Sequence, residues 1–355
     1  MSSVKKIPTV ILGGTGYVAG ELMRLLHAHP HFERAAVVSD SKPGALIADA
    51  FPHLSSAVGD NCFVSVEDAQ QLLCSTPDSL VLAAAPHGVS ASLIDQLLTY
   101  TAQAGRYPKI VDISADYRFR DATAYQAVYR HAHGAPHRMS EFTCALPEHI
   151  HTLPHQHVAH PGCFATAMLL SIVPLISLQL IEPRVFVSGI TGSTGSGRTP
   201  TEGTHHPRRH SNLYSYGVLQ HRHAPEVVSV VKTVTGAEIE CHFVPHSGPF
   251  ARGIHATTQA KLIKPLAADD VKAALRDFYK DQPFVQVLDQ APHLKDIVSS
   301  NYAHLSASTD GGTVAVVSAI DNLTKGAAGG AIQWANRLFG FEQSTGLNAP
   351  APGWT

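Results

Sequence analysis

The chain has 355 residues, of which 44% are hydrophobic and 15% are charged. Disordered chains are poor in apolar residues, so this composition indicates a folded protein whose length suits two domains. The 26 basic side chains are balanced by 28 acidic ones, which argues against nucleic acid as a partner. No run of about 18 apolar residues occurs, so we expect no membrane span.

The start of the chain and its cysteines bear on the compartment. Residues 1–8 lead directly into a strand-like run, without the apolar stretch of a signal peptide. The five cysteines are widely spaced, which is typical of reduced thiols rather than of a disulfide framework. We therefore expect a cytoplasmic protein in which any special cysteine is catalytic.

The first part of the chain alternates apolar runs with helix-like segments. Such alternation indicates parallel βαβ units, so we expect an α/β fold with a Rossmann-like, doubly wound parallel sheet. The expected strands are 9–12, 35–38, 79–85 and 109–113, and the expected helices are 21–26 and 90–98.

The later part has longer strand-like runs and fewer helices, which favours an α+β domain with a mixed sheet covered on one face. The expected strands are 185–190, 239–244, 255–262 and 313–320, and the expected helices are 225–234, 267–279 and 326–338. We expect a dinucleotide-binding domain formed by 1–162 and 326–355, and a catalytic and dimerisation domain formed by 163–325.

A glycine-rich turn, Gly13-Gly14-Thr15-Gly16, follows the first expected strand. Glycine lets the backbone approach a pyrophosphate, whose charge then lies at the N-terminus of the next helix. The strand-to-helix position supports a dinucleotide site over a merely structural turn. The cofactor contacts that we assign to this turn are Gly13, Thr15, Gly16, Tyr17 and Val18.

The end of the second expected strand bears on the choice of dinucleotide. Asp40 favours the free ribose 2′-hydroxyl of NAD. The neighbours of Asp40 instead suit the 2′-phosphate of NADP; they are Ser39, Ser41 and Lys42. These residues conflict, so their identity leaves both cofactors open.

Cys163 follows a Pro-Gly turn and precedes the segment 165–172, which we expect to be helical. At a helix N-terminus the dipole and the free N–H groups favour the thiolate, which is the nucleophilic form of cysteine. A buried packing cysteine is the alternative interpretation.

The segment 192–198 contains too much glycine for the interior of a strand or helix. We interpret it as a functional loop in which Arg198 is a candidate anion ligand. A plain flexible loop is the alternative.

Two histidines precede Pro225, a residue that suits the first turn of a helix. An imidazole on such a positioned loop can move a proton near neutral pH, and Glu226 is placed to orient it. The rival interpretation is a metal site, but the cysteine or carboxylate ligands at tight spacing that zinc usually requires are not evident. We therefore expect no metal.

Several motifs occur in a specific order: HPGC at 160–163, HRHAPE at 221–226 and KGAAG at 325–329. With GGTGYVAGEL at 13–22 and GSTGSGR at 192–198, they run from the first expected strand to the last expected helix. In these motifs the chain resembles the N-acetyl-γ-glutamyl-phosphate reductases, whose wider group includes the aspartate-semialdehyde dehydrogenases.

The resemblance implies reduction of N-acetyl-L-glutamyl 5-phosphate to the 5-semialdehyde in arginine biosynthesis, with NADP(H) as the cofactor. Cys163 matches the family's nucleophile, which forms a thioester and releases phosphate. His221 best matches the acid–base histidine, with Glu226 as its partner and His223 as the second choice. The resemblance also implies a homodimer or homotetramer.

The resemblance adds further site residues. Guanidinium groups suit bidentate recognition of phosphate and carboxylate, although a structural ion pair is the alternative for each arginine. The substrate contacts that we assign are Arg118, Arg198, His223 and Arg252. The remaining cofactor contacts are Pro86, Gly195, Asn322 and Lys325.

Two departures from the family pattern keep alternatives open. Asp40 stands where basic or hydroxyl residues are common, so strict preference for NADP is open. The insert at 205–209 resembles relatives in lysine biosynthesis that reduce an aminoadipyl phosphate, so the exact acyl chain is open. Rival functions are a non-catalytic NADP-binding sensor of the same fold and a histidine-rich metal-binding module.

Overall fold

The computed structural model describes residues 6–152 and 157–354. The chain divides into two compact units, which are described separately. The first unit comprises Met1–Cys144, Thr152–His160 and Ala331–Leu347. The second comprises Ala145–His151, Pro161–Gly330 and Asn348–Thr355.

The first unit is built on a six-stranded parallel sheet with the strand order β2-β1-β3-β4-β6-β5. The chain leaves β1 towards β2 on one side and then crosses to β3 on the other, so the strand order reverses beside β1. The strands are β1 (Ile7–Leu12), β2 (Phe32–Val37), β3 (Leu80–Ala83), β4 (Lys109–Asp112), β5 (Phe142–Cys144) and β6 (His157–Ala159).

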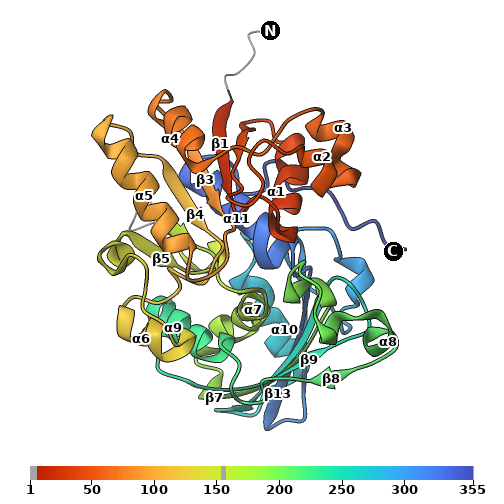
Figure 1. Cartoon of the computed structure of the whole chain (residues 1–355). Helices are drawn as coiled ribbons and strands as arrows, with labels where there is room; N and C mark the ends of the chain where they lie inside the picture. Colours follow the sequence, from red (N-terminus) through yellow and green to blue (C-terminus); the bar gives the residue numbers. More distant parts are fainter. Residues whose placement is uncertain (1–5, 153–156, 355) are drawn as a thin grey trace. The chain divides into compact units, whose positions relative to one another are not determined.

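Helices cover both faces of this sheet. In Figure 1, α4 and α5 lie on one side of β1, β3 and β4, and α1 and α11 lie on the other. The α-helices are α1 (Tyr17–His27), α2 (Ile47–Ala50), α3 (Ser55–Val58), α4 (Val66–Cys74), α5 (Ser90–Gln103), α6 (Ala122–Tyr129) and α11 (Gly329–Leu338), of which α11 begins in the second unit. The 3₁₀ turns are η1 (Pro52–Leu54) and η2 (Pro136–Glu141).

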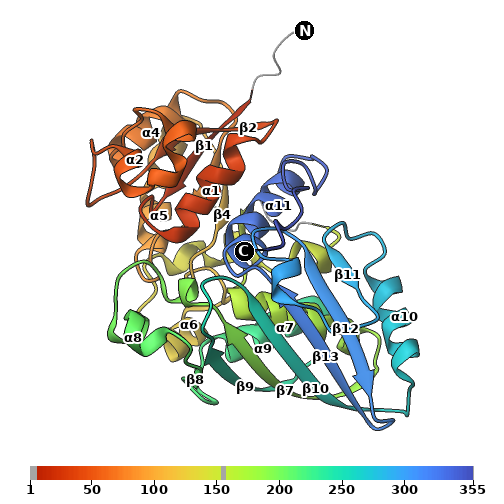
Figure 2. The same ribbon diagram turned by 90° about the vertical axis from the view of Figure 1, so that its right-hand side faces the viewer.

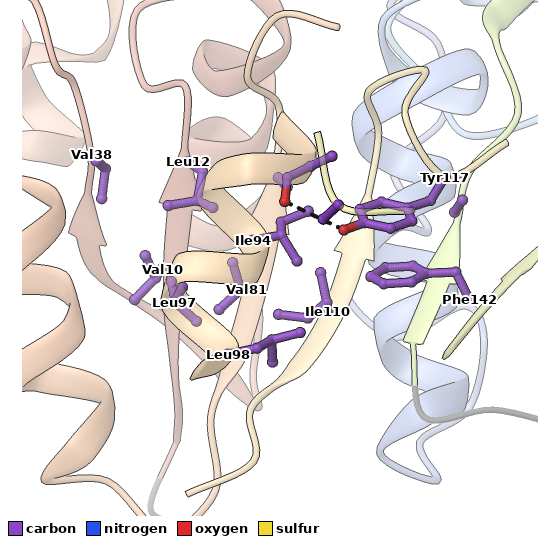
Figure 3. Close-up of a cluster of buried hydrophobic side chains, with 14 of the residues drawn as sticks. Val10, Leu12, Val38, Val81, Ile94, Leu97, Leu98, Ile110, Tyr117 and Phe142 are labelled. Atoms are coloured by element: carbon purple, nitrogen blue, oxygen red, sulfur yellow. Dashed lines mark hydrogen bonds between the residues drawn. The ribbon is translucent and has the colours of Figure 1, made fainter. Parts of the chain in front are cut away.

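The core of the first unit lies between the sheet and helices α4 and α5. Figure 3 shows Val10, Val81 and Ile110 of the strands facing Ile94 and Leu97 of α5, and all of them are fully buried. Strand residues that are apolar on both faces are typical of a parallel sheet covered by helices on each side. This packing fixes the carboxyl ends of β1 and β3, from which the loops of the first unit start.

The second unit contains a seven-stranded mixed sheet with the order β11-β12-β13-β10-β7-β9-β8. Its β7–β9 and β11–β12 pairs are parallel, and its other pairs are antiparallel. The strands are β7 (Ile181–Thr191), β8 (Tyr214–Ser215), β9 (Glu240–Ser247), β10 (Ile254–Leu262), β11 (Val285–Val287), β12 (Ala303–Thr309) and β13 (Thr313–Ile320).

Three helices, α7, α9 and α10, pack on this sheet, and Figure 2 shows α7 and α9 behind its strands. Nearly every residue of α7 is buried, which suits a central helix in contact with β7, β10 and β13. The α-helices are α7 (Cys163–Ser177), α8 (His206–Arg209), α9 (His223–Thr235) and α10 (Ala268–Phe278). Shorter turns are η3 (Pro147–His149), η4 (Ser193–Ser196), η5 (Glu202–Thr204), η6 (Leu294–Asp296) and the π-helical turn η7 (Thr324–Ala328).

The predicted fold class is confirmed, with a doubly wound parallel sheet in one unit and a mixed sheet in the other. The sequence analysis missed five strands, which are β5, β6, β8, β11 and β12, and five helices, which are α2, α3, α4, α6 and α8. The missed strand β12 has the sequence AHLSAST, whose small and polar residues give no apolar run. Among residues 6–152 and 157–354, no helix is long and apolar enough to cross a membrane.

Candidate active site

The glycine turn after β1 lies against the turn after β3. Gly13 has a φ of +75°, and a Cβ placed on it would lie 2.5 Å from the Cα of Ala85. Only glycine permits this backbone-to-backbone approach. The two turns flank the point where the strand order reverses, which is where open α/β sheets bind ligands.

Helix α1 begins directly after this turn and has no side-chain cap at its N-terminus. Its first amides are therefore placed as an anion site. The amide of Gly14 donates to the carbonyl of Val38 at 2.7 Å, so the segment that begins at Ser39 starts beside the turn. Ser39 is buried, whereas Ser41 and Lys42 are exposed, as is Asp40. The structure thus brings the predicted pyrophosphate turn and the predicted ribose segment together in the first unit.

The turn that contains Pro86 is held by a carboxylate that the sequence analysis did not select. Asp116 is fully buried and accepts hydrogen bonds from the amides of Gly88 at 2.7 Å and Ala91 at 2.9 Å. It thereby fixes the turn at the start of α5. Arg118, a predicted substrate contact, lies two residues after Asp116 in the sequence. Its side chain is buried and donates a hydrogen bond to the carbonyl of Ile113 at 2.9 Å.

In the second unit, Cys163 is the first residue of α7, as predicted. Two residues from distant parts of the sequence fix its turn. Glu226 is fully buried, and its Oε1 accepts a hydrogen bond from the amide of Gly162 at 2.6 Å. A Cβ placed on Gly326 would lie 2.8 Å from the Cβ of Cys163, so η7 can approach the nucleophile candidate only without a side chain there.

A cavity of about 350 Å³ opens at Cys163 within the second unit. It brings together four of the predicted site residues: Cys163, Gly195, His221 and His223. Hydroxyl groups dominate the rest of its lining, and no acidic side chain is among the lining residues. The other lining residues are Phe164, Thr191, Gly192, Ser196, Thr201, Gly203, Thr204, Tyr214, Tyr216, Arg222 and Ser247.

The electrostatics of the cavity favour neutral hydrogen-bond donors. Burial, with a smaller contribution from Arg222, lowers the pKa of His221 to about 4. The Nδ1 atom of His221 accepts a hydrogen bond from the amide of His223 at 3.2 Å, which leaves the ring proton on Nε2. Burial, with the charge of Cys163, raises the pKa of Tyr216. At neutral pH both side chains therefore carry a proton that they can donate.

Arg252, one of the remaining predicted residues, does not line this cavity. It forms a bidentate ion pair with Asp321, with both N–O distances 2.9 Å, and also donates to Thr324. Lys325 is fully buried and forms an ion pair with Glu148.

Asn322 and Arg198 are likewise outside the lining. Asn322 accepts from the amide of Gly253 at 2.8 Å and donates to Thr194 at 3.0 Å, so it joins the glycine-rich loop to β10. Arg198 is exposed. In the described part of the chain, no group of three or more His, Cys, Asp or Glu side chains is arranged to hold a metal ion.

Several lining residues were missed by the sequence analysis. Thr201, Thr204 and Ser247 gave no signal, because single hydroxyl residues in loops are common. Tyr216 and Arg222 lie in or beside the motif that contains His221, and this proximity was the available signal.

Family models match both units. Residues 8–151 match the model described as "Semialdehyde dehydrogenase, NAD binding domain". Residues 163–322 match the model described as "Semialdehyde dehydrogenase, dimerisation domain". A protein of Dehalococcoides mccartyi named N-acetyl-γ-glutamyl-phosphate reductase is 35% identical over 353 residues, which cover 98% of this chain and 99% of that protein. The chain belongs to the N-acetyl-γ-glutamyl-phosphate reductase family.

Other relatives agree with this assignment. A Nitrosococcus oceani protein of the same name is 36% identical over 96% of this chain and 98% of its own length. Among solved structures, aspartate semialdehyde dehydrogenase II of Vibrio cholerae superposes with a TM-score of 0.69 at 15% identity, covering 95% of this chain and 99% of that one. This likeness shows that the chain shares its fold with that aspartate semialdehyde dehydrogenase.

Proposed function

We propose that the chain catalyses the NADPH-dependent reduction of N-acetyl-L-glutamyl 5-phosphate to N-acetyl-L-glutamate 5-semialdehyde, with release of phosphate. The observation that carries this proposal is the cavity in which Cys163, at the N-terminus of α7, lies with His221. Together with membership of the family, this arrangement supports acyl transfer through a cysteine.

In the proposed reaction the thiolate of Cys163 attacks the acyl carbon and forms a C–S bond. The C–O bond to phosphate breaks, and phosphate leaves with the electron pair. The dipole of α7 stabilises the thiolate before attack. Glu226 acts as a positioning residue, because it holds the amide of Gly162 and so sets the turn that presents the thiol. The product of this half-reaction is a thioester on Cys163.

NADPH, when bound, supplies the hydride that reduces this thioester. The residues of the first unit fit such a group: α1 starts without a side-chain cap, and a Cβ on Gly14 would meet Val37 at 2.5 Å, so the turn tolerates no side chain there. We assign the 2′-phosphate to Ser39, Ser41 and Lys42.

The Nε2–H group of His221 donates a hydrogen bond to the oxygen that becomes negative as the thioester is reduced, and the ring stays neutral. The neutral ring is suited to this role, since a lowered pKa makes its N–H group a ready donor to an oxyanion. The resulting oxyanion re-forms its C=O bond as the C–S bond breaks, so the electron pair returns to sulfur, the aldehyde is released and Cys163 is a thiolate again. His223 lines the same cavity and is the alternative hydrogen-bond donor to this oxygen.

The test is the reverse reaction, in which N-acetylglutamate semialdehyde, phosphate and NADP yield the acyl phosphate and NADPH. NADPH absorbance should rise only when phosphate is present. Matched assays use NAD in place of NADP, and the aminoadipate homologue in place of the acetylated aldehyde. If none of these combinations gives phosphate-dependent turnover, the proposal is contradicted.

We also propose that the chain forms a homodimer or homotetramer. Support comes from residues 163–322, which match a model described as a dimerisation domain. Light scattering on the purified chain should give at least twice the mass of 37.9 kDa. A monomer at micromolar concentration would contradict this.

A cytoplasmic location is proposed as well. It is supported by the five cysteines, all of which are free thiols in the structure. Cell fractionation with antibody detection should place the chain in the cytoplasmic fraction, and recovery in an exported fraction would contradict the proposal.

A further inference from the structure

Arg209 of α8 is a buried cation, and the partners that the structure describes for it are neutral. Only 8% of its surface is exposed. Its guanidinium donates to the hydroxyl of Ser247 at 2.5 Å and to the carbonyls of Gly248 and Phe250. Within the described ranges no carboxylate forms an ion pair with Arg209, and its Nε–H group has no acceptor. The positive charge of Arg209 is therefore not neutralised by these residues.

Two other cations of the second unit differ from Arg209 in this respect. Lys325, which is fully buried, forms an ion pair with Glu148, and Arg252 forms a bidentate ion pair with Asp321. A buried charge that lacks a counter-ion is destabilising, because it has lost the solvation of water and gained no opposite charge. An anionic ligand that binds near Arg209 would supply this charge.

Ser247 connects Arg209 with the cavity at Cys163, because Ser247 is one of the residues that line it. A guanidinium only donates hydrogen bonds, so the Oγ atom of Ser247 is the acceptor in its bond with Arg209. The proton of the Ser247 hydroxyl points elsewhere, and among the residues that the structure describes no acceptor takes it. This proton is therefore available to a ligand in the cavity.

The charge of Arg209 also reaches a second hydroxyl in the lining. Burial raises the pKa of Tyr216, and the positive charges of Arg222 and Arg209 oppose this shift. The guanidinium of Arg209 thus lies within electrostatic reach of the phenol. Since the lining contains no acidic side chain, the potential on this side of the cavity favours an anion.

We propose that Ser247, supported by Arg209, forms an oxyanion subsite of this cavity that holds a carboxylate or phosphate oxygen of the substrate; this inference rests on the proposed function. Ser247 is the group that contacts the anion. Arg209 is a positioning residue, because its hydrogen bond leaves the Ser247 proton for the ligand and its charge polarises that hydroxyl. The substrate has two groups with this chemistry, which are its α-carboxylate and its acyl phosphate.

The experiment measures how well three anions protect Cys163 from alkylation by iodoacetamide, with peptide mass spectrometry as the readout. The anions are N-acetylglutamate, 4-acetamidobutanoate, which lacks only the α-carboxylate, and inorganic phosphate. If the subsite holds the carboxylate, N-acetylglutamate should protect the unaltered chain at a concentration about tenfold or more below that of 4-acetamidobutanoate, and Ser247→Ala should abolish this difference. If it holds the phosphate, Ser247→Ala should raise the half-protecting concentration of inorganic phosphate by about tenfold or more.

Further variants distinguish this role from a structural one. Ser247→Thr keeps the hydroxyl and should retain the protection, whereas Arg209→Met should weaken it and Arg209→Lys should recover part of the loss. Arg208→Ala and Ser215→Ala are the matched controls, because both side chains are exposed and outside the lining, and they should behave as the unaltered chain does. Thermal melting verifies that each variant is folded. A merely structural role would lower the melting temperature without changing which anion protects.

The outcomes separate the two proposals, because alkylation requires no turnover. If the unaltered chain gives no phosphate-dependent oxidation of N-acetylglutamate semialdehyde, the proposed function fails, and the protection assay still decides on the subsite. The subsite is overturned if none of the anions protects the unaltered chain, or if Ser247→Ala leaves every half-protecting concentration unchanged. A loss of protection in Ser247→Ala that Ser247→Thr does not restore would also overturn it, since the hydroxyl is the group that binds.

Discussion

Two strand-to-helix turns, one before α1 and one before α7, have the same outline and are built in different ways. Both the turn before α1 and the turn before α7 lead into a helix without a side-chain cap. The first turn is made by glycines that are neighbours in the sequence and pack against backbone, as Gly13 does against Ala85. The second is fixed by Glu226 and Gly326, which are far from Cys163 in the sequence.

The difference corresponds to what each turn presents. A turn that receives a pyrophosphate needs bare backbone, so consecutive glycines are sufficient to build it. A turn that presents a side chain needs that side chain held in one direction, and this requires groups from elsewhere in the fold. Substitutions in the turn before α1 should therefore weaken NADP binding, whereas substitutions around the turn before α7 should lower turnover.

The largest effect is expected from Cys163→Ser. Serine is a far weaker nucleophile than a thiolate, so phosphate-dependent oxidation should fall by about 10⁴-fold or more. NADP binding, measured by fluorescence titration, should stay unchanged because the turn before α1 is intact. Turnover of the serine variant within tenfold of that of the unaltered chain would contradict the covalent mechanism.

Gly13→Ala should give the converse result. Its positive φ and its contact with Ala85 should lower the free energy of unfolding by about 3 kcal/mol and weaken NADP binding. Alkylation of Cys163 by iodoacetamide, followed by peptide mass spectrometry, should proceed at the unaltered rate in folded protein. Gly105→Ala is the control, since Gly105 has a φ of +66° with open space around it. Equal effects of the two variants on NADP binding would contradict the backbone contact.

Gly326→Ala should disturb the turn before α7 alone. The new methyl group would lie 2.8 Å from the Cβ of Cys163, so the thiol would have to move. A misplacement of a reacting group by about 1 Å lowers kcat by about 10²-fold. Gly312→Ala is the matched control, because the nearest atom to its Cβ is 3.9 Å away. NADP affinity serves as the second readout and should not change. An alanine variant at 326 with full kcat would show that η7 does not position the thiol.

Glu226→Ala should lower kcat by about tenfold or more, because the amide of Gly162 loses its acceptor. Glu226→Gln keeps an oxygen acceptor and should recover most of this loss. The ratio of the two kcat values therefore tests positioning. If the glutamine variant is as slow as the alanine variant, the charge of Glu226 matters rather than its hydrogen bond to Gly162.

The smallest effect concerns the protonation of His221. Because its pKa is lowered to about 4, the ring should stay neutral from pH 8 to pH 5.5. A base with a lowered pKa in the folded state contributes stability above its unfolded pKa of about 6.5, and this contribution is lost as the pH falls towards 4. NMR of the imidazole C–H signals, with His221→Gln for assignment, measures this directly. A midpoint near 6.5 would contradict the buried, neutral donor.

Much of the fold could be predicted from the sequence, since apolar runs and glycine turns are local signals. Strand β13 and the start of α7 at Cys163 agree closely with the prediction. Short elements such as β8 and α8 lack periodicity and could not be recognised.

For the site, the sequence predicts which reactive side chains are present but not which residues they contact. Cys163 and His221 share a cavity, but the partners of other residues come from long-range packing. Asp321 is 69 positions from Arg252, Glu148 is 177 positions from Lys325, and Gly162 is 64 positions from Glu226. Such pairings depend on the tertiary structure, so sequence spacing gives no access to them.

The buried pair of Lys325 and Glu148 has a consequence for how this chain can change over time. Losing either partner strands the other charge in a dry interior, at a cost of about 3–5 kcal/mol, whereas replacing both with apolar residues of similar volume is far milder. Single substitutions at position 148 or 325 are therefore strongly selected against. Position 325 adjoins Gly326, so the segment that contacts Cys163 also tolerates few substitutions.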